Sequence, residues 1–384
     1  MMPTPPMPGP DVLAQAAKVE AHLRCVVEAA GGWLGFDTFM REALYAPGLG
    51  YYAAGSRKLA APTDAAASSD FITSPELSPW FGRTLAGPVA DVLRASGSQT
   101  VLEIGAGTGA LAASLIPALR DEGLAARYAI LEVSADLRQR QQQRLADFGD
   151  AIEWLEVLPD EFEGCVLANE VLDAMPVRLF CWSAEGDILE RGVTWRDGWR
   201  WQDRLADAEL AARVGDRMPP LPGYVSEINL QAEAWIQGMG GWLRRGAALF
   251  IDYGFPRHEY YHPQRLAGTL MCHFRHTAND DPLWLPGVQD ITAHVDFTAM
   301  ADAALEGGLE VLGYTSQAAF LLDAGLLQRL DAWRSRAPAD YLRELDRVQK
   351  LVSEAEMGEL FKVLALGRGI DTPRGFGRDR CHTL

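Results

Sequence analysis

Three closely spaced glycines follow an apolar run in the first half of the chain. The segment Val101-Leu-Glu-Ile-Gly-Ala-Gly-Thr-Gly109 carries them, and a second apolar run, Tyr128-Ala-Ile-Leu-Glu132, ends in an acid. Glycine lets the backbone turn sharply and leaves no side chain between the peptide and a bound molecule. A carboxylate at the end of the second run can accept hydrogen bonds from both hydroxyls of a ribose. The pattern predicts a strand, a glycine turn, a helix and a second strand, the unit that holds an adenosine-bearing cofactor.

Two cofactors fit this unit, and Glu103 favours one of them. The spacing Gly105-x-Gly107-x-x-Ala110 formally satisfies a dinucleotide fingerprint. Glu103 would place a negative charge next to an incoming pyrophosphate, whereas S-adenosyl-L-methionine has no phosphate and carries a cationic sulfonium and amino group. We therefore expect S-adenosyl-L-methionine, with a dinucleotide or an empty glycine turn as the alternatives. The expected binding residues here are Glu103, Gly105, Gly107, Gly109 and Glu132.

Two further acids follow the next predicted strand. The segment Asn169-Glu-Val-Leu-Asp173 would lie where a transferred methyl group is expected. If this loop turns helically, Glu170 and Asp173 face the same way, and we predict that both are catalytic, with Asn169 beside the cofactor. The alternative is the N-terminus of a helix, with Asn169 as the N-cap and the acids complementing the dipole.

Other polar residues are candidates for contact with a ligand. Thr73 and Glu76, in Asp70-Phe-Ile-Thr-Ser-Pro-Glu-Leu-Ser78, are expected in a flap over the cofactor, although helix capping explains Ser74 equally well. Glu227 either holds the substrate or is an ordinary acid at a helix N-terminus. Asp252 and Tyr253, at the end of another predicted strand, are expected beside the substrate.

A group of histidines invites a zinc hypothesis, which the spacing does not support. The segment Cys272-His273-x-x-His276, with His262 and His294, matches no standard structural zinc site, and no metal is expected. We predict instead that His294 and Asp296 hold in place a lid that residues 255–296 form. His294 is also a candidate for removing a proton.

Alternating strand-like and helix-like segments predict an α/β protein with an open, doubly wound, Rossmann-like sheet of seven strands. The expected strands are 100–104, 127–131, 152–157, 164–168, 247–252, 309–315 and 361–366. A helical and flap segment over 11–95 follows a disordered arm over 1–10. The core comprises 96–178 and 246–384, and the insertion over 179–245 contains an antiparallel ribbon and a helix.

Composition narrows the class of protein and its partners. The 384 residues are 48% hydrophobic and 23% charged, and the net charge is −17. Nucleic-acid affinity depends mainly on Lys and Arg at phosphates, so no nucleic-acid partner is expected. No apolar run is long enough for a membrane span. Five cysteines without a C-x-x-C pair predict reduced thiols and a cytoplasmic location. A bacterial protein is expected.

Several motifs together resemble one family, the MidA-type S-adenosylmethionine-dependent methyltransferases. Besides the segments above, they are Tyr51-Tyr52, Phe81-Gly82, Leu131-Glu-Val-Ser134, Ala168-Asn-Glu-Val-Leu-Asp-Ala-Met-Pro176, Ser226-Glu-Ile228, Ile251-Asp-Tyr-Gly254 and Asp290-Ile-Thr-Ala-His-Val-Asp-Phe297. They span residues 35 to 367 in the family's order. One departure is the approach over Arg57 to Ser69, which is longer than usual and has Ser69 in place of a glycine.

The resemblance implies a class I methyltransferase fold and, in the mitochondrial branch, methylation of protein arginine in respiratory complex I assembly. It therefore suggests a protein substrate, with a complex I subunit as one candidate. A small-molecule methyltransferase and a low-turnover assembly factor are the alternatives. Association as a homodimer through the aromatic insertion is a further option.

Overall fold

The computed structural model describes residues 6–53, 73–275, 277–334 and 337–384. It divides into two compact units, which are treated separately below. The sheet unit comprises residues 73–172, 233–256 and 295–384, and the ribbon unit comprises residues 6–53, 173–232 and 257–294. The chain crosses from one unit to the other directly before Asp173 and directly after His294, two of the predicted catalytic residues.

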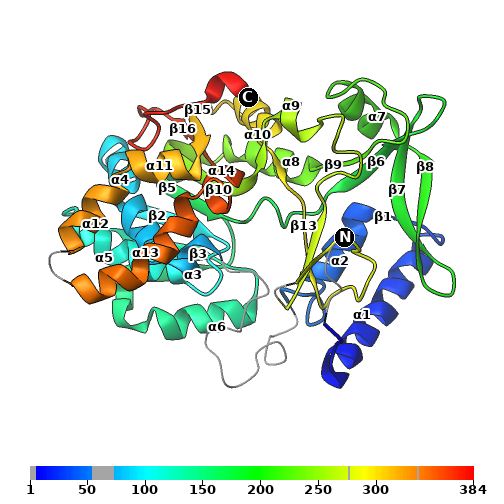
Figure 1. The fold of residues 1–384 in the computed structure, drawn as a ribbon, viewed down its shortest axis with the longest axis horizontal. Helices are drawn as coiled ribbons and strands as arrows, with labels where there is room; N and C mark the ends of the chain where they lie inside the picture. The colour runs from blue at the N-terminus through cyan, green and yellow to red at the C-terminus, as the bar shows by residue number, and fades with distance from the viewer. Residues whose placement is uncertain (1–5, 54–72, 276, 335–336) are drawn as a thin grey trace. The chain divides into compact units, whose positions relative to one another are not determined.

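The sheet unit is built on a sheet whose main path has the strand order β15-β16-β10-β5-β2-β3-β4, with β14 paired to β10 (Figure 1). Its strands are β2 (Thr100–Ile104), β3 (Arg127–Leu131), β4 (Ile152–Leu155), β5 (Phe162–Asn169), β10 (Leu243–Phe255), β14 (Val295–Asp296), β15 (Glu310–Ser316) and β16 (Phe361–Arg368). The first five of these are parallel, and β16 runs antiparallel to both of its neighbours. The seven predicted strands are confirmed.

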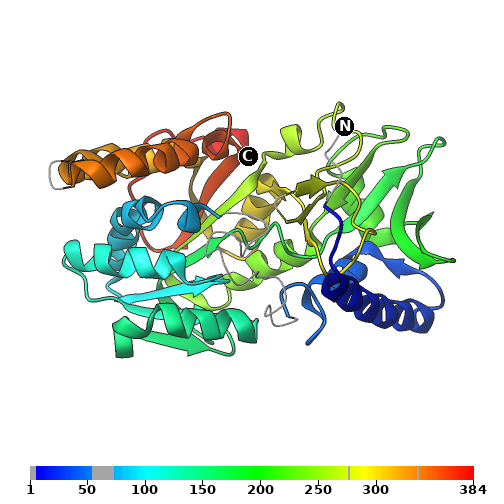
Figure 2. The same cartoon turned by 60° about the horizontal axis from the view of Figure 1, so that its bottom comes forward.

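Helices cover the sheet because its strands are apolar on both faces, as Ala247–Ile251 illustrate with no exposed surface. The order β5-β2-β3 moves along the sheet in one direction and β2-β5-β10 in the other, so right-handed crossovers place α5 and α8 on opposite faces. The helices of this unit are α3 (Ser74–Leu77), α4 (Trp80–Ser96), α5 (Ala110–Asp121), α6 (Ala135–Arg144), α8 (Leu230–Met239), α10 (Phe297–Glu306), α11 (Gln317–Asp323), α12 (Leu326–Arg334), α13 (Pro338–Val352) and α14 (Met357–Leu360). Helices α12 and α13 lie side by side (Figure 2).

The ribbon unit holds two antiparallel sheets. The larger has the order β1-β7-β6-β9, with β8 paired to β7, and the smaller has the order β12-β11-β13. Their strands are β1 (Leu34–Gly35), β6 (Arg178–Trp182), β7 (Ile188–Trp195), β8 (Trp199–Leu205), β9 (Val225–Ile228), β11 (Met271–Phe274), β12 (Thr277–Asn279) and β13 (Asp290–Thr292). Helices α1 (Pro10–Ala29), α2 (Phe36–Tyr45), α7 (Ala208–Gly215) and α9 (Arg257–Tyr260) complete the unit. The predicted antiparallel ribbon is confirmed.

The N-terminal segment and the insertion belong to the same unit, although the sequence analysis separated them. Strand β1 pairs with β7, and α2 packs on both β6 and β7, so residues far apart in the sequence share one core. That core includes Phe36, Phe39 and Val193, all without exposed surface. The first helix begins at Pro10 inside the expected arm, while residues 1–5 and the approach over Arg57 to Ser69 lie outside the described residues.

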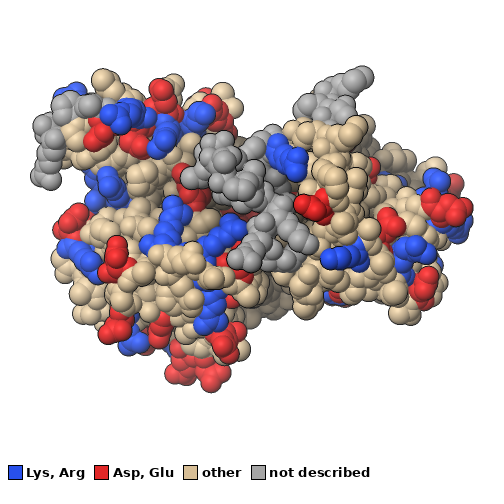
Figure 3. Space-filling view, turned by 90° about the horizontal axis from the view of Figure 1, so that it is seen from below, with Lys and Arg blue, Asp and Glu red and all other residues tan. Residues whose placement is uncertain are grey.

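The surface is mixed in charge. On the face in Figure 3, lysine and arginine side chains are interspersed with aspartate and glutamate. Within the part of the chain that the structure describes, no helix combines the length and the apolar character that crossing a bilayer requires.

Candidate active site

The glycine turn lies between β2 and α5, as predicted. Gly105, Gly107 and Gly109 have φ angles of 66°, 54° and 83°, a region that side chains rarely adopt. A Cβ at Gly105 would come 3.0 Å from Val171, and one at Gly109 would come 3.1 Å from Leu145. A Cβ at Gly107 would meet nothing within 4 Å, so the turn presents bare backbone to open space there.

Glu132, at the end of β3, is joined to this turn by a glutamine that the sequence analysis did not single out. One carboxylate oxygen of Glu132 accepts from Ser134 N at 2.9 Å, and the other accepts from Gln141 Nε2 at 3.0 Å. Gln141 Nε2 also donates to the carbonyl of Gly107 at 2.8 Å, and Trp154 Nε1 donates to Gln141 Oε1 at 3.0 Å. Burial raises the pKa of Glu132, and these donors oppose that rise.

Glu103 is a buried acid in β2, with 3% of its surface exposed. The Tyr128 hydroxyl, on the neighbouring strand β3, donates to its carboxylate at 2.6 Å. Burial raises the pKa of Glu103 to about 7, the Tyr128 hydrogen bond opposes this, and the charge of Glu132 adds to it. A cation next to Glu103 would stabilise its ionised form, so the environment suits a positively charged ligand.

Glu76 and Thr73 belong to the short helix α3, where Thr73 is the N-cap residue. The Glu76 carboxylate accepts a hydrogen bond from the Thr108 hydroxyl in the glycine turn and forms an ion pair with Arg144 at 2.7 Å. Glu76 therefore ties α3 to the turn and to the end of α6. Contact of either residue with the cofactor stays a prediction, and Asp70 lies outside the described residues.

The segment after β5 is not helical, so neither the expected helical turn nor the alternative helix N-terminus is present, and the catalytic roles of Glu170 and Asp173 stay predictions. Glu170 has a φ of 53°, which directs the chain out of the strand into a turn instead of a helix. Its carboxylate accepts from Asn169 Nδ2 at 3.0 Å and from Ser74 N at 3.3 Å. Asn169 Oδ1 is buried and, among the described residues, has no hydrogen-bond partner.

Asp252 supports this turn from β10. It has 1% of its surface exposed, and its Oδ2 accepts from Val171 N at 3.2 Å and from Leu172 N at 2.9 Å. Its Oδ1 accepts from Tyr253 N at 2.9 Å, and the Tyr253 ring packs edge-on against Phe361. These contacts give Asp252 a positioning role, and direct contact of Asp252 or Tyr253 with substrate stays a prediction.

In the ribbon unit, Asp173 lies in a cluster of tyrosines and acids. The Tyr52 hydroxyl donates to both carboxylate oxygens of Asp290, at 2.9 and 3.0 Å. Loss of solvent around the phenol, and then the charge of Asp290, raise the pKa of Tyr52, and Asp173 is close enough to add to the rise. The Tyr45 ring stacks on Tyr52 at 5.5 Å. The family resemblance pointed to Tyr52 and Asp290 as motif residues but gave them no role.

The main chain holds His294 near Asp173. Ala293 N donates to the carbonyl of Asp173 at 2.9 Å, and His294 N donates to Thr269 Oγ1 at 3.0 Å. In the sheet unit, Asp296 is the N-cap of α10, where its Oδ1 accepts from Ala299 N at 3.1 Å. Asp296 thus has a structural role in helix capping, whereas the roles of His294 in a lid or in proton removal stay predictions.

Glu227 lies in β9, so its interpretation as an acid at a helix N-terminus is wrong. Only 1% of its surface is exposed, and its carboxylate accepts from Thr269 N at 2.9 Å and from Leu270 N at 3.0 Å. The same carboxylate also accepts hydrogen bonds from the hydroxyls of Ser226, Tyr260 and Thr269. Glu227 anchors the segment that precedes β11, and a role in holding substrate stays a prediction.

No group of three or more His, Cys, Asp or Glu side chains is placed to hold a metal ion within the described ranges. His276 of the histidine segment lies outside those ranges.

Comparison with known proteins agrees with this geometry. Residues 84–315 match the model of a family described as "Putative S-adenosyl-L-methionine-dependent methyltransferase". A crystal structure from Burkholderia thailandensis, bound to S-adenosyl-homocysteine, is 50% identical, with 99% of this chain and 100% of that one covered and a TM-score of 0.92. A native crystal structure from the same organism is 49% identical with the same coverage and a TM-score of 0.89.

More distant relatives have named activities. The protein arginine methyltransferase NDUFAF7, mitochondrial, of Mus musculus is 27% identical over 394 residues, which cover 92% of this chain and 85% of that protein. Its homolog in Drosophila melanogaster is 28% identical over 407 residues, which cover 95% and 89%. The family match extends over more than half of the chain, and the sheet has the strand order of a class I methyltransferase. This chain belongs to the family of S-adenosyl-L-methionine-dependent methyltransferases.

Proposed function

We propose that this chain transfers a methyl group from S-adenosyl-L-methionine to an arginine side chain of a protein. The observation that carries the proposal is the pair of acids around Tyr52 in the ribbon unit. Tyr52 donates to both oxygens of Asp290, and the charge of Asp173 also acts on the Tyr52 hydroxyl. The names of the mouse and fruit-fly relatives support the same acceptor.

A guanidinium group suits this cluster in shape and charge. It is planar, carries five N–H donors and stays protonated at any working pH. Asp173 and Asp290 can accept those donors, and each charge-assisted hydrogen bond contributes about 1.5–3 kcal/mol. The Tyr52 hydroxyl donates to both oxygens of Asp290, which orients the carboxylate that would accept from the guanidinium.

The sheet unit offers groups that fit the cofactor. The open space at Gly107 admits a ligand against bare backbone, and each oxygen of Glu132 has acceptor capacity left for a ribose hydroxyl. Glu103 provides a carboxyl group whose ionised form a bound cation would stabilise, and the buried Oδ1 of Asn169 is an acceptor for an N–H group. S-adenosyl-L-methionine, when bound, supplies a methyl group on a positively charged sulfur.

Each methylation of a guanidinium releases one proton, so the site needs a base. Asp173, which is 5% exposed, is our candidate to accept it, with His294 as a further acceptor joined to the same turn through the Ala293 N–H. Alignment of the acceptor nitrogen is expected to contribute most, since positioning can be worth about 7–11 kcal/mol.

The resemblance to MidA-type proteins supports a respiratory-complex subunit as the acceptor, encountered in the cytoplasm of a bacterium. The identity of the acceptor is tested by incubating the protein and labelled S-adenosyl-L-methionine with an extract of cells that lack this chain. Proteins are precipitated, hydrolysed and analysed for methylarginine. The expected result is label in methylarginine with the wild type and its loss with Asp173→Ala, at nearly unchanged affinity for S-adenosylhomocysteine.

Asp216→Asn is the matched control, because it changes an exposed acid of the same unit. It should transfer methyl at the wild-type rate. Label confined to small molecules would show that the methyl acceptor is a small molecule and not a protein. Tight binding of S-adenosylhomocysteine without any transfer would favour an assembly factor and contradict the proposal.

A further inference from the structure

Helix α6 carries a single buried side chain, and that side chain is a glutamine. The structure describes every residue of α6, and of these Gln141 alone is buried, with no exposed surface. The two residues that follow it, Gln142 and Gln143, are exposed. Burying an amide costs free energy unless its polar atoms find partners, so this position indicates specific polar contacts.

The contacts of Gln141 fix the direction of its amide. Nε2 donates to the carbonyl of Gly107 at 2.8 Å and to Glu132 Oε2 at 3.0 Å, which uses both of its hydrogens. Oε1 accepts from Trp154 Nε1 at 3.0 Å. An indole N–H can only donate, so Trp154 holds the amide oxygen on its own side and turns the hydrogens toward Gly107 and Glu132. A reversed amide would place its oxygen against a carbonyl and a carboxylate.

One face of α6 holds both oxygens of Glu132. Ser134 N, at the N-cap of the helix, donates to Oε1 at 2.9 Å, and Gln141 donates to Oε2. Seven residues, about two helical turns, separate Ser134 from Gln141, so the two lie on the same face. Rotation of the Glu132 carboxylate would break one of these hydrogen bonds.

The same amide holds the glycine turn. Gly107 has a φ of 54°, and its carbonyl accepts from Gln141. Because the peptide group is planar and trans, a fixed Gly107 carbonyl also fixes the direction of the Thr108 N–H. A Cβ at Gly109 would come 3.6 Å from Gln141 Cγ, so the side chain packs against the turn as well. One buried amide therefore joins the terminal acid of β3 to the turn between β2 and α5.

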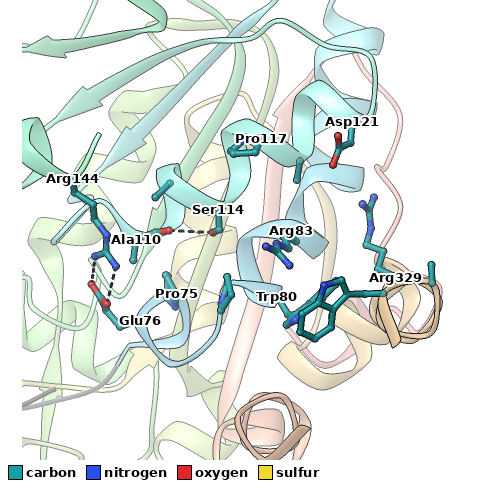
Figure 4. Close-up of a pocket in the computed structure, with 15 residues that line it drawn as sticks. Pro75, Glu76, Trp80, Arg83, Ala110, Ser114, Pro117, Asp121, Arg144 and Arg329 are labelled. Atoms are coloured by element: carbon teal, nitrogen blue, oxygen red, sulfur yellow. Dashed lines mark hydrogen bonds and ion pairs between the residues drawn. The ribbon is translucent and has the colours of Figure 1, made fainter. Parts of the chain in front are cut away.

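A second contact ties α6 to its surroundings from the surface. Arg144, at the end of the helix, forms an ion pair with Glu76 of α3 at 2.7 Å (Figure 4). The two side chains are 40% and 31% exposed, and ion pairs in contact with water contribute little. The buried amide of Gln141 is therefore the stronger constraint on the acid and the turn.

We propose that Gln141 is a positioning residue of the cofactor site. It holds the Glu132 carboxylate in the orientation that accepts from the ribose hydroxyls, and Trp154 sets the direction of its amide. Gln141 has no exposed surface, so it acts through Glu132 and not by touching S-adenosyl-L-methionine. This role rests on the proposed contact of Glu132 with the ribose.

Calorimetric titration of the full chain with S-adenosylhomocysteine tests this role in two backgrounds, the wild type and Glu132→Ala. Gln141→Leu removes both donors. In the wild-type background it should weaken binding about 10-fold, because the charged acceptor loses a hydrogen bond that orients it. In the Glu132→Ala background it should weaken binding less than about 3-fold, because the group through which Gln141 acts is absent. A glutamine that only supports the fold would cost the same factor in both backgrounds, and that result overturns the proposal.

Two further variants complete the experiment. Gln142→Leu is the matched control, because it makes the same substitution at the exposed neighbour on the same helix, and it should bind at wild-type affinity. Trp154→Phe keeps an aromatic ring but removes the N–H that directs the amide, so it should weaken binding about 3-fold or more in the wild-type background alone. If Gln141→Leu does not fold, Trp154→Phe decides.

The result for Glu132→Ala separates two kinds of failure. Wild-type affinity in that variant removes Glu132 from the cofactor site and overturns the role of Gln141 with it. Weakened binding in Glu132→Ala, combined with wild-type affinity in Gln141→Leu and Trp154→Phe, overturns the role of Gln141 alone. Calorimetry measures cofactor binding, so neither result depends on which acceptor receives the methyl group.

Discussion

The hydroxyl of Tyr52 donates to both carboxylate oxygens of Asp290, at 2.9 and 3.0 Å, although 238 positions separate the two residues in the chain. Tyr52 follows α2, and Asp290 begins β13, so the contact joins the N-terminal segment to the small three-stranded sheet. The pair fixes the orientation of an acid that we assign to the recognition of arginine.

Tyr52→Phe should lower methyl transfer to protein about 10- to 100-fold, because Asp290 loses the donor that orients it. The rings of Tyr45 and Tyr52 stack, and phenylalanine preserves that contact. The affinity for S-adenosylhomocysteine should stay at its wild-type value, since Tyr52 belongs to the ribbon unit and the proposed cofactor residues to the sheet unit. Initial rates and calorimetry on the same preparation check both points, and wild-type rates would show that the Asp290 contact is not required.

Glu132→Ala should weaken the binding of S-adenosylhomocysteine at least about 10-fold, because the carboxylate that would accept from the ribose is removed. The matched control is Glu153→Ala on the next strand, where an exposed acid pairs with Arg127 at 3.5 Å. Calorimetric titration should detect the loss in the first variant and wild-type affinity in the second. Equal affinity of both variants would remove Glu132 from the cofactor site.

The titration of Glu103 should give the cofactor-free protein a distinct pH dependence. Its pKa is about 7 in the folded protein and 4.5 ordinarily, so the folded state retains a proton that the unfolded chain loses first. The free energy of unfolding therefore falls as pH rises from about 4.5 to about 7, by about 3 kcal/mol, and then levels off.

Glu103→Gln should lack this decline, because glutamine does not titrate. Urea unfolding of both proteins across this pH range measures the difference between them. If a bound cation stabilises the ionised Glu103, the affinity for S-adenosyl-L-methionine should also rise with pH up to about 7 in the wild type only. Parallel stability profiles for the two proteins would contradict the assigned pKa.

Glu227→Gln should destabilise the protein by about 2–4 kcal/mol, since an amide cannot accept from every donor around a buried carboxylate. The exposed Glu209, in the first turn of α7, provides the control Glu209→Gln, for which a change within about 0.5 kcal/mol is expected. Urea unfolding measures both. A normal stability combined with a raised KM for the protein substrate would instead support the substrate role predicted from the sequence.

Local patterns were sufficient to predict much of the sheet unit. The apolar runs at 100–104 and 127–131 form β2 and β3 at those bounds, and the glycines between β2 and α5 take the left-handed conformations that their type suggested. The helical turn expected over Glu170 and Asp173 is absent, because spacing alone cannot show that Glu170 adopts a positive φ and that its carboxylate accepts from Ser74 N and Asn169 Nδ2.

The sequence by itself determined the class of cofactor site, because strand, glycine turn, helix and terminal acid are encoded within about 30 neighbouring residues. Tertiary structure alone decided which groups the carboxylates contact. Asp252 and Glu227 lie in motifs that resemble functional ones, yet their carboxylates bind backbone N–H groups of distant segments. The carboxylate of Asp290 instead accepts a hydrogen bond from the Tyr52 hydroxyl. The partner of a carboxylate depends on which distant segment the fold brings to it, and residue type and spacing do not contain that information.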